Sequence, residues 1–187
     1  GFTLGYVGSV GTWYLFDAAV AAFKEVRRHC PGARFLVINR GGHAYIRERL
    51  AAASIEEAAV ELQEAIYSDV PLQMARMDAG VFFYKPAYSR AACAPTKLGE
   101  FLGCGVPCLA NTGVGDVATI LHQDRVGVAV EATDAVNLQR GVAELLALCA
   151  DPDTRMRCVA SARRHFSLDE GVRRYAAIYG ELDGASH

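Results

Sequence analysis

The chain has 187 residues, of which 52% are hydrophobic and 21% are charged, and its formal net charge is −2. This length suits one α/β domain with a sizeable core, and the lack of a basic excess argues against a nucleic-acid-binding protein. No apolar run reaches the roughly 18 residues that span a bilayer. We therefore expect a cytoplasmic protein.

The six cysteines favour free thiols over disulfides. They lie in apolar contexts such as Cys104–Cys108, where a thiol behaves as a small hydrophobic group. A chain of this size does not need disulfides to fold. No CxxC pair exists and no histidine lies at zinc spacing, so we expect mostly buried thiols and no metal site.

The first half of the chain alternates between strand and helix patterns. The run Phe35–Ile38 is apolar throughout, which suits a parallel strand covered on both faces. Short apolar runs predict strands over residues 2–8, 34–39, 59–62 and 79–84. Helical periodicity and its stop signals predict helices over residues 13–29, 43–53 and 71–76.

The second half continues the alternation and then becomes helical. A helix opens at Pro95–Thr96 and is followed by strands over residues 106–110 and 127–130, with a short helix between them. Helices are then expected over residues 135–149, 152–165 and 168–182. Alternating strands and helices imply a parallel sheet with helices on both faces. The predicted fold is therefore a Rossmann-like, three-layer α/β/α sheet.

Ligands of such a sheet bind at the carboxyl ends of its strands, where loops 8–12, 39–42, 85–97 and 111–116 should meet. Gly8, Gly11 and Gly113 would let the backbone approach a ligand closely. His43 follows one of these loops and could reach the cleft, although a surface histidine is the more ordinary interpretation.

The helix that starts at Thr96 offers free backbone N–H groups and the positive end of a dipole to an anion. Lys97 lies in its first turn, where a cation is mildly unfavourable. A bound diphosphate would explain it, and a solvated surface lysine is the alternative. The carboxylate of Glu100 could accept hydrogen bonds from two ribose hydroxyls. On spacing alone, an exposed helical glutamate is the simpler interpretation.

These residues belong to a longer run, Pro95–Pro107, that resembles the signature of the group 1 (family 4) glycosyltransferases, which have the GT-B fold. The resemblance covers nearly the whole chain in the same order. Further matching segments are Asp78–Phe83, Gly113–Asp116, Gly127–Val130 and Arg164–Ser167, the last with Tyr175 and Tyr179.

The resemblance implies that residues 1–187 are the C-terminal half of a GT-B fold and form one donor-binding domain. The N-terminal, acceptor-binding domain is then expected outside this sequence, and any peripheral contact with the inner membrane would come through that domain. The chain alone is expected to be inactive. The helix over residues 168–182 would cross back to that domain. Its apolar side should then be partly exposed here, at Val172, Tyr175, Ile178 and Tyr179.

The resemblance also implies a retaining, metal-independent transfer, without a cofactor, from a UDP- or GDP-linked sugar to a saccharide or lipid-linked acceptor. Glu100 would bind the ribose, and the backbone from Ala92 to Thr96 would bind sugar hydroxyls and phosphate. The expected substrate-binding residues are Gly8, Ser9, Gly11, Ala94, Pro95, Thr96, Lys97, Glu100 and Gly113.

The sequence departs from the family pattern in two places. The family places a second glutamate eight positions before the first, and here that position is Ala92. The loop after the first strand lacks the usual Arg and Lys. We hypothesise that Lys97 supplies the missing positive charge, while the catalytic group stays unknown. Half of a sugar-nucleotide epimerase and a non-catalytic nucleotide-binding module are the alternative functions.

Overall fold

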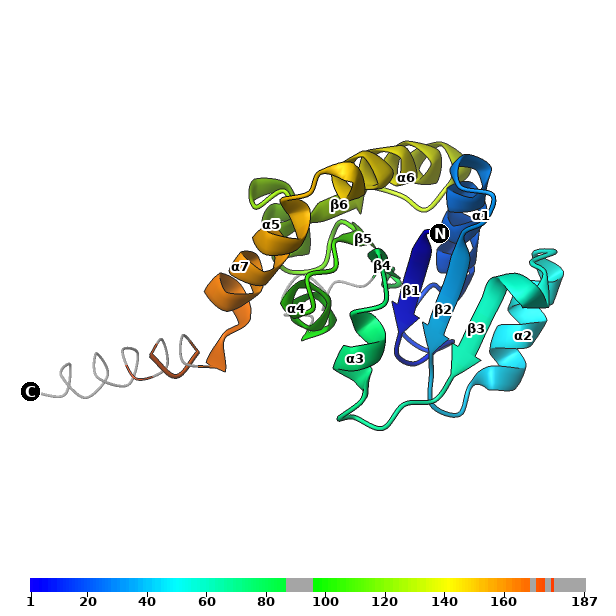
Figure 1. Cartoon of the computed structure of the whole chain (residues 1–187), viewed down its shortest axis with the longest axis horizontal. Helices are drawn as coiled ribbons and strands as arrows, with labels where there is room; N and C mark the ends of the chain where they lie inside the picture. Colours follow the sequence, from blue (N-terminus) through cyan, green and yellow to red (C-terminus); the bar gives the residue numbers. More distant parts are fainter. Residues whose placement is uncertain (87–95, 169–170, 174–175, 177–187) are drawn as a thin grey trace, which may run out of the picture.

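The computed structural model describes residues 1–86, 96–168, 171–173 and 176. Within them, six strands form one parallel sheet in the order β3-β2-β1-β4-β5-β6 (Figure 1). The strands are β1 (Thr3–Val7), β2 (Arg34–Ile38), β3 (Val60–Gln63), β4 (Ala79–Phe82), β5 (Cys108–Asn111) and β6 (Gly127–Val130). The strand order reverses between β1 and β4, which makes this the topological switch point of the sheet.

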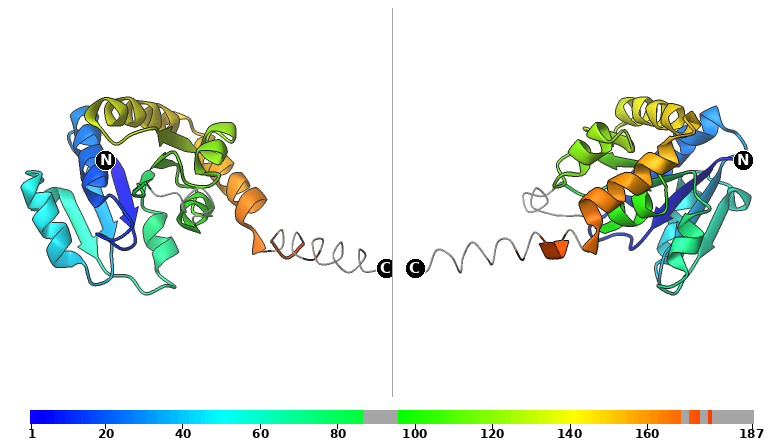
Figure 2. Two further views of the ribbon diagram at one scale, coloured as in Figure 1. Left: turned by 180° about the vertical axis from the view of Figure 1, so that it is seen from behind. Right: turned by 60° about the vertical axis from the view of Figure 1, so that its left-hand side comes forward.

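Helices cover both faces of the sheet, as Figure 2 shows from two further directions. The helices are α1 (Phe16–His29), α2 (His43–Ala52), the 3₁₀ helix η1 (Glu57–Ala59), α3 (Val70–Met74), α4 (Thr96–Gly103), α5 (Val117–Gln123), α6 (Ala135–Ala150) and α7 (Thr154–Phe166). Within the described ranges, none is long and apolar enough to cross a membrane.

Two buried clusters, one on each face, hold the three layers together. Side chains of α1, α2 and α6 form the first cluster with one face of the sheet. Side chains of α3, α4, α5 and α7 form the second with the other face. Within β1, Leu4 and Tyr6 belong to the first cluster and Val7 to the second. Burial on both faces explains why the central strands are mostly apolar, and it confirms the predicted α/β/α fold.

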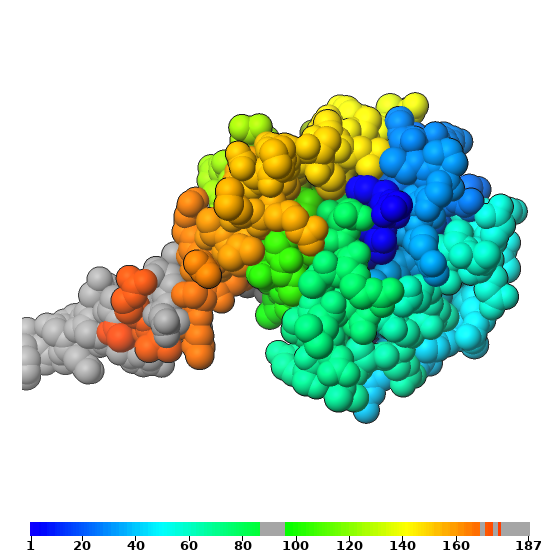
Figure 3. Space-filling view, in the orientation of Figure 1, coloured from blue at the N-terminus to red at the C-terminus, as the bar shows by residue number. Residues whose placement is uncertain are grey.

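Helix α7 fixes the position of α4, the helix that begins at Thr96. The two helices pack against each other, and α7 lies at the surface in the space-filling view of Figure 3. Gly99 permits this close approach, because a Cβ built on it would lie 2.7 Å from the ring of Phe166. The first turn of α4 is therefore held in place by packing as well as by its own hydrogen bonds.

The elements predicted before residue 168 are all present in the described residues, with some shifted ends. The largest shift is at α1, which begins at Phe16 and not at Trp13. Tyr14 instead forms an isolated antiparallel bridge with Tyr84. The Leu15 amide donates to the Phe83 carbonyl at 2.9 Å. Because these backbone groups bond to another segment, they cannot also form a first helical turn.

The helix expected over residues 168–182 lies mostly outside the described residues. Val172 is 59% exposed, in agreement with the expected exposure of its apolar side. Tyr175, Ile178 and Tyr179 lie outside the described residues. The return of this helix to another domain therefore stays a prediction.

The described cysteines are free, as the sequence predicts. Cys108 and Cys158 are buried, and burial raises the pKa of the Cys158 thiol to about 12. The pKa of Cys149 is also raised to about 12 by burial. These thiols therefore stay protonated at neutral pH and serve as packing groups. Cys93 lies outside the described residues.

Candidate functional site

The loops that follow β1 and β4 are joined to each other at the switch point. The rings of Tyr14 and Tyr84 lie 4.7 Å apart between centroids, and their hydroxyls share a hydrogen bond of 3.3 Å. The Lys85 amide donates to the Trp13 carbonyl at 3.0 Å. The Lys85 ammonium donates to the Gly11 carbonyl at 2.8 Å. These contacts join residues 11–15 to residues 83–85 in a short antiparallel ribbon, which forms one edge of the candidate site.

The side chain of Lys97, on α4, reaches the ribbon at Tyr14 and the end of β1 at Val7. Its side chain is buried, so its interpretation as a solvated surface lysine is wrong. Its Nζ donates a hydrogen bond to the carbonyl of Val7, the last residue of β1. The same nitrogen lies 5.1 Å from the centroid of the Tyr14 ring. Burial lowers the pKa of Lys97, and the negative charge of Glu100 partly opposes this effect.

Gly8 must be glycine for two reasons. Its φ is +124°, which L side chains rarely adopt, and a Cβ built on it would clash with the ammonium of Lys97. The Tyr6 hydroxyl donates to the Ser9 carbonyl at 2.5 Å and so holds the loop after β1. The structure thus brings together the predicted residues Gly8, Ser9 and Lys97.

Two buried asparagines, which sequence reasoning did not select, fix the neighbouring strand ends. Asn39 donates from Nδ2 to the Gly8 carbonyl at 2.8 Å and accepts from the Gly42 amide at 2.7 Å. Asn111 accepts from the Tyr84 amide at 2.8 Å and donates to the Tyr84 carbonyl at 3.2 Å. Each side chain links two loops at the carboxyl edge of the sheet. An asparagine that ends a buried strand is the signal that could have revealed them.

The other predicted residues lie around this group without bonding to it. Thr96 and Glu100 are exposed on the first two turns of α4. Gly113 lies in the open turn after β5, with a φ of +78°. Within the described residues, none of the three forms a side-chain hydrogen bond or ion pair. Ala94 and Pro95 lie outside the described residues.

His43, the first residue of α2, has a structural contact. One of its ring nitrogens lies 2.8 Å from the Asn39 carbonyl oxygen, and the side chain is half-buried. The histidine therefore packs against the loop after β2. It is neither a free surface residue nor a group that projects alone into the cleft.

Three basic residues lie along this edge, together with the exposed carboxylates of Glu100 and Asp116. Lys24, Lys85 and Lys97 are the three lysines of the chain, and the last two lie at the switch point. The loop after β2 adds the exposed Arg40. A lysine is a compact point charge whose pKa responds to burial, whereas arginine stays charged. The positions of Lys85 and Lys97 therefore favour an anionic ligand.

A hollow of about 410 Å³ adjoins the ribbon. Gly11, Tyr14 and Lys85 form its wall on the side of the switch point. Tyr45 and Thr133 also line it, as does Asp17 of α1, whose carboxylate is paired with Arg49. Its volume lies within the range of about 300 to 1,000 Å³ that ligand sites usually occupy. The switch point therefore offers space as well as polar groups.

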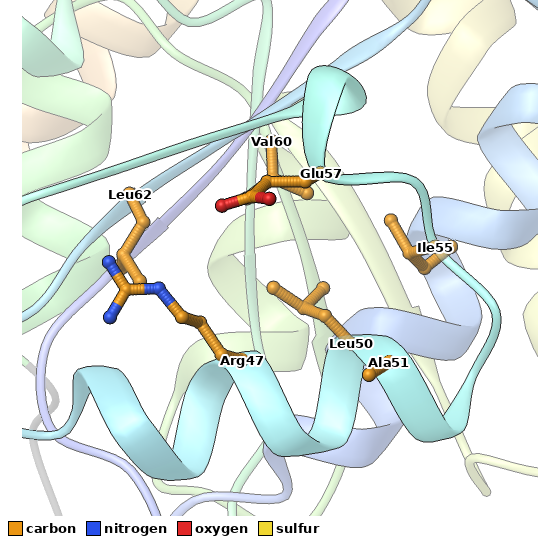
Figure 4. A pocket seen from close by; sticks show the side chains of 7 residues that line it. All are labelled: Arg47, Leu50, Ala51, Ile55, Glu57, Val60 and Leu62. Atoms are coloured by element: carbon orange, nitrogen blue, oxygen red, sulfur yellow. The ribbon is translucent and has the colours of Figure 1, made fainter.

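A second hollow, of about 360 Å³, lies between α2 and the edge strand β3. Figure 4 shows side chains from α2 on one side of it and from η1 and β3 on the other. Its lining is mostly aliphatic, with the exposed Arg47 and Glu57 as its charged residues. The charge of Arg47 is offset by that of Glu57, and the aliphatic lining offers a phosphate few polar partners, so this hollow is a poor candidate for a nucleotide site.

Comparisons with solved structures identify the fold. The pneumococcal O-GlcNAc transferase GtfA, in complex with UDP and GlcNAc, is 16% identical over 97% of this chain and 36% of its own, with a TM-score of 0.71. S. aureus TarM is 11% identical over 95% of this chain and 35% of its own, with a TM-score of 0.74. Anabaena HepE, in complex with UDP and glucose, is 15% identical over 97% of this chain and 48% of its own, with a TM-score of 0.70.

The chain thus spans between about a third and a half of the length of these proteins. The likeness shows the fold, which is that of the C-terminal half of GT-B glycosyltransferases. A search of curated protein sequences gives no significant match. The family model described as "Glycosyl transferases group 1" matches residues 1–148, which is most of the chain. The chain therefore belongs to the group 1 glycosyl transferases.

Proposed function

We propose that this chain is the nucleotide-sugar-binding part of an enzyme that transfers a sugar from a UDP- or GDP-linked donor to a saccharide or lipid-linked acceptor. The observation that carries the proposal is the buried ammonium of Lys97, placed at the switch point beside Gly8 and at the start of α4. The structures of GtfA and HepE, which contain UDP, support a uridine nucleotide as the first candidate.

The ammonium of Lys97 suits the diphosphate of such a donor. It has three N–H donors, and within the described residues Val7 provides its one hydrogen-bond acceptor. The remaining donors can bind phosphate oxygens. The free backbone N–H groups at the start of α4 lie next to it in the chain, and helix N-termini favour anions. Lys85, on the other side of the ribbon, adds a second positive charge.

Glu100 suits the ribose. It lies one turn after Lys97 on α4, and its exposed carboxylate has no hydrogen bond or ion pair within the described residues. Two carboxylate oxygens can accept hydrogen bonds from two adjacent hydroxyls. Placing the diphosphate at Lys97 and the ribose at Glu100 therefore orients the nucleotide along α4.

We further propose that the reaction is retaining and needs no metal. The leaving diphosphate gains negative charge as its bond to the sugar breaks, and fixed positive groups stabilise this charge. Lys97, Lys85 and the start of α4 can supply these groups. The resemblance of Pro95–Pro107 to the family 4 signature supports retention of configuration. The remainder of the active site is proposed to come from an acceptor-binding domain.

A calorimetric titration of the chain tests this function. UDP, GDP and ADP are titrated without metal and then with Mg²⁺. We expect one nucleotide to bind without metal, and Glu100→Gln to weaken its affinity about tenfold, as loss of a charge-assisted hydrogen bond would do. Glu144→Gln, an exposed glutamate on α6, is the matched control and should change nothing. Failure of all three nucleotides to bind would contradict the proposal.

A further inference from the structure

We propose that Tyr14 is a positioning residue, whose ring holds the ammonium of Lys97 in place for the diphosphate of the donor. This inference rests on the proposed function, because it assigns a role to the surroundings of the same ammonium. The family pattern has basic residues in the loop after the first strand, and here an aromatic residue from that loop contacts a lysine on α4. The positive charge thus comes from α4, and the ring that holds it comes from the segment between β1 and α1.

The Tyr14 ring is itself firmly placed. Its backbone pairs with Tyr84 in an antiparallel bridge, and its ring packs against the Tyr84 ring at 4.7 Å between centroids. The Leu15 amide, directly after it, donates to the Phe83 carbonyl. The ring therefore cannot turn away from the switch point without breaking contacts to β4 and the residues that follow it.

An aromatic ring is well suited to hold this cation. Among the described residues no carboxylate forms an ion pair with Lys97, and Glu100 is the acidic residue whose charge acts on it. A direct carboxylate partner would neutralise the charge and occupy its N–H donors. The negative face of a ring attracts the ammonium without accepting a full hydrogen bond. Tyr14 therefore stabilises the charged form and leaves donors free for phosphate oxygens.

The test compares two variants that differ in the ring alone. Tyr14→Phe keeps the ring and loses the hydroxyl contact to Tyr84, whereas Tyr14→Leu loses both. The first readout is the rate at which an amine-reactive ester modifies Lys97 as a function of pH, followed by mass spectrometry with the exposed Lys24 as internal reference. The second readout is the affinity for UDP by calorimetry.

We expect Tyr14→Phe to resemble the wild type in both readouts. Tyr14→Leu should move the midpoint of the Lys97 modification profile to lower pH, because the charged amine has lost a favourable contact. It should also weaken UDP binding by about five- to thirtyfold, the range of a cation–π contact that is shielded from water. The midpoint separates a change in pKa from a change in access, which alters the rate at all pH values.

An unchanged midpoint in a folded Tyr14→Leu variant would overturn the inference. So would a shifted midpoint with unchanged UDP affinity, since the ring would then hold the ammonium without serving the nucleotide. If the wild type itself fails to bind UDP, GDP or ADP, the proposed function fails and this role of Tyr14 fails with it. Wild-type binding that Tyr14→Leu leaves unchanged refutes the role of Tyr14 alone.

Discussion

The hollow next to the switch point and the hollow beside β3 have similar volumes, about 410 and 360 Å³, but the polar side chains around them are held differently. At the switch point, the buried side chains of Lys97, Asn39 and Asn111 bond to the backbone of other segments. Beside β3, the charged residues Arg47 and Glu57 are exposed around an aliphatic lining. The comparison teaches that convergent buried polar groups, and not the volume of a hollow, locate the site.

The largest expected effect is that of Gly8→Ala at the switch point. The variant combines left-handed backbone strain with displacement of the Lys97 ammonium, so we expect it to lower the free energy of unfolding by about 2 to 4 kcal/mol. Gly41→Ala, in the loop after β2, is the matched comparison, because Gly41 has a φ of +87° and no atom within 4 Å of an added Cβ. It should cost about 1 to 2 kcal/mol from strain alone. Equal losses in urea unfolding would show that Lys97 does not constrain Gly8.

The second comparison is between two amide side chains that end strands of the two regions. Asn111→Ala removes two buried side-chain hydrogen bonds to the backbone of Tyr84 and should cost about 2 to 3 kcal/mol. Gln63→Ala, at the end of β3, removes a side-chain hydrogen bond of 2.9 Å to Gln73 and should cost less than about 1 kcal/mol. Urea unfolding of both variants measures the difference, and a larger loss for Gln63→Ala would reverse the ranking of the regions.

Nucleotide affinity should depend on one region alone. Lys97→Met should weaken the binding of UDP by about ten- to a hundredfold, as expected for loss of a charge-assisted contact to a diphosphate. Arg47→Met, at the other hollow, should leave the affinity within about twofold, since it takes part in none of the proposed contacts. Calorimetry on both variants decides between the two hollows. A loss confined to Arg47→Met would move the site to β3.

Above neutral pH, the stability of the fold should depend on the ionisation of Lys97 at the switch point. Because burial holds the pKa of Lys97 in the folded state below its ordinary 10.5, the unfolded chain binds more protons between these two values. The cost of burying the charge is fully present at lower pH and is relieved as pH rises through the folded-state pKa. The wild type should therefore gain stability relative to Lys97→Met as pH rises towards 10. Parallel pH profiles of the two proteins would contradict this.

The smallest effect on stability is expected at acidic pH, from the ion pair between Glu61 of β3 and Arg76. The hydrogen bond from Arg76 lowers the pKa of Glu61 below 4.5, so the pair stabilises the fold above that value and loses its effect as pH falls through the folded-state pKa. The pair is exposed, and exposed pairs contribute at most about 1 kcal/mol. Thermal unfolding of Glu61→Gln between pH 3 and 6 should show a slightly flatter profile than the wild type. A steeper one would be inconsistent with the pair.

The sequence predicts the fold well because its central strands are buried on both faces. The runs around Phe35 and Val81 are apolar for this reason, and their strands lie where the patterns place them. The start of α1 is predicted too early, since Tyr14 and Leu15 fit a helical pattern but bond to the segment after β4. Contacts between distant segments decide where this helix begins, and the local pattern of apolar residues carries no information about such contacts.

The candidate site is predictable only where a local motif marks it. Lys97 and Glu100 follow from the start of α4 and its signature. Asn39 and Asn111 do not, because their partners lie 31 and 27 residues away. Tyr14 is hidden for the same reason, since its role depends on a lysine from another helix. The sequence thus indicates the charged group but not the residues that hold it.

The antiparallel bridge between Tyr14 and Tyr84 makes two loops into one cooperative unit. Opening either loop breaks the hydrogen bonds that flank the bridge, from Leu15 to Phe83 and from Lys85 to Trp13. The amide protons of Leu15 and Lys85 should therefore exchange with solvent through the same opening event. A ligand that touches only the loop after β1 then slows exchange in both segments, so occupancy at Gly8 is transmitted to Lys85 through the backbone.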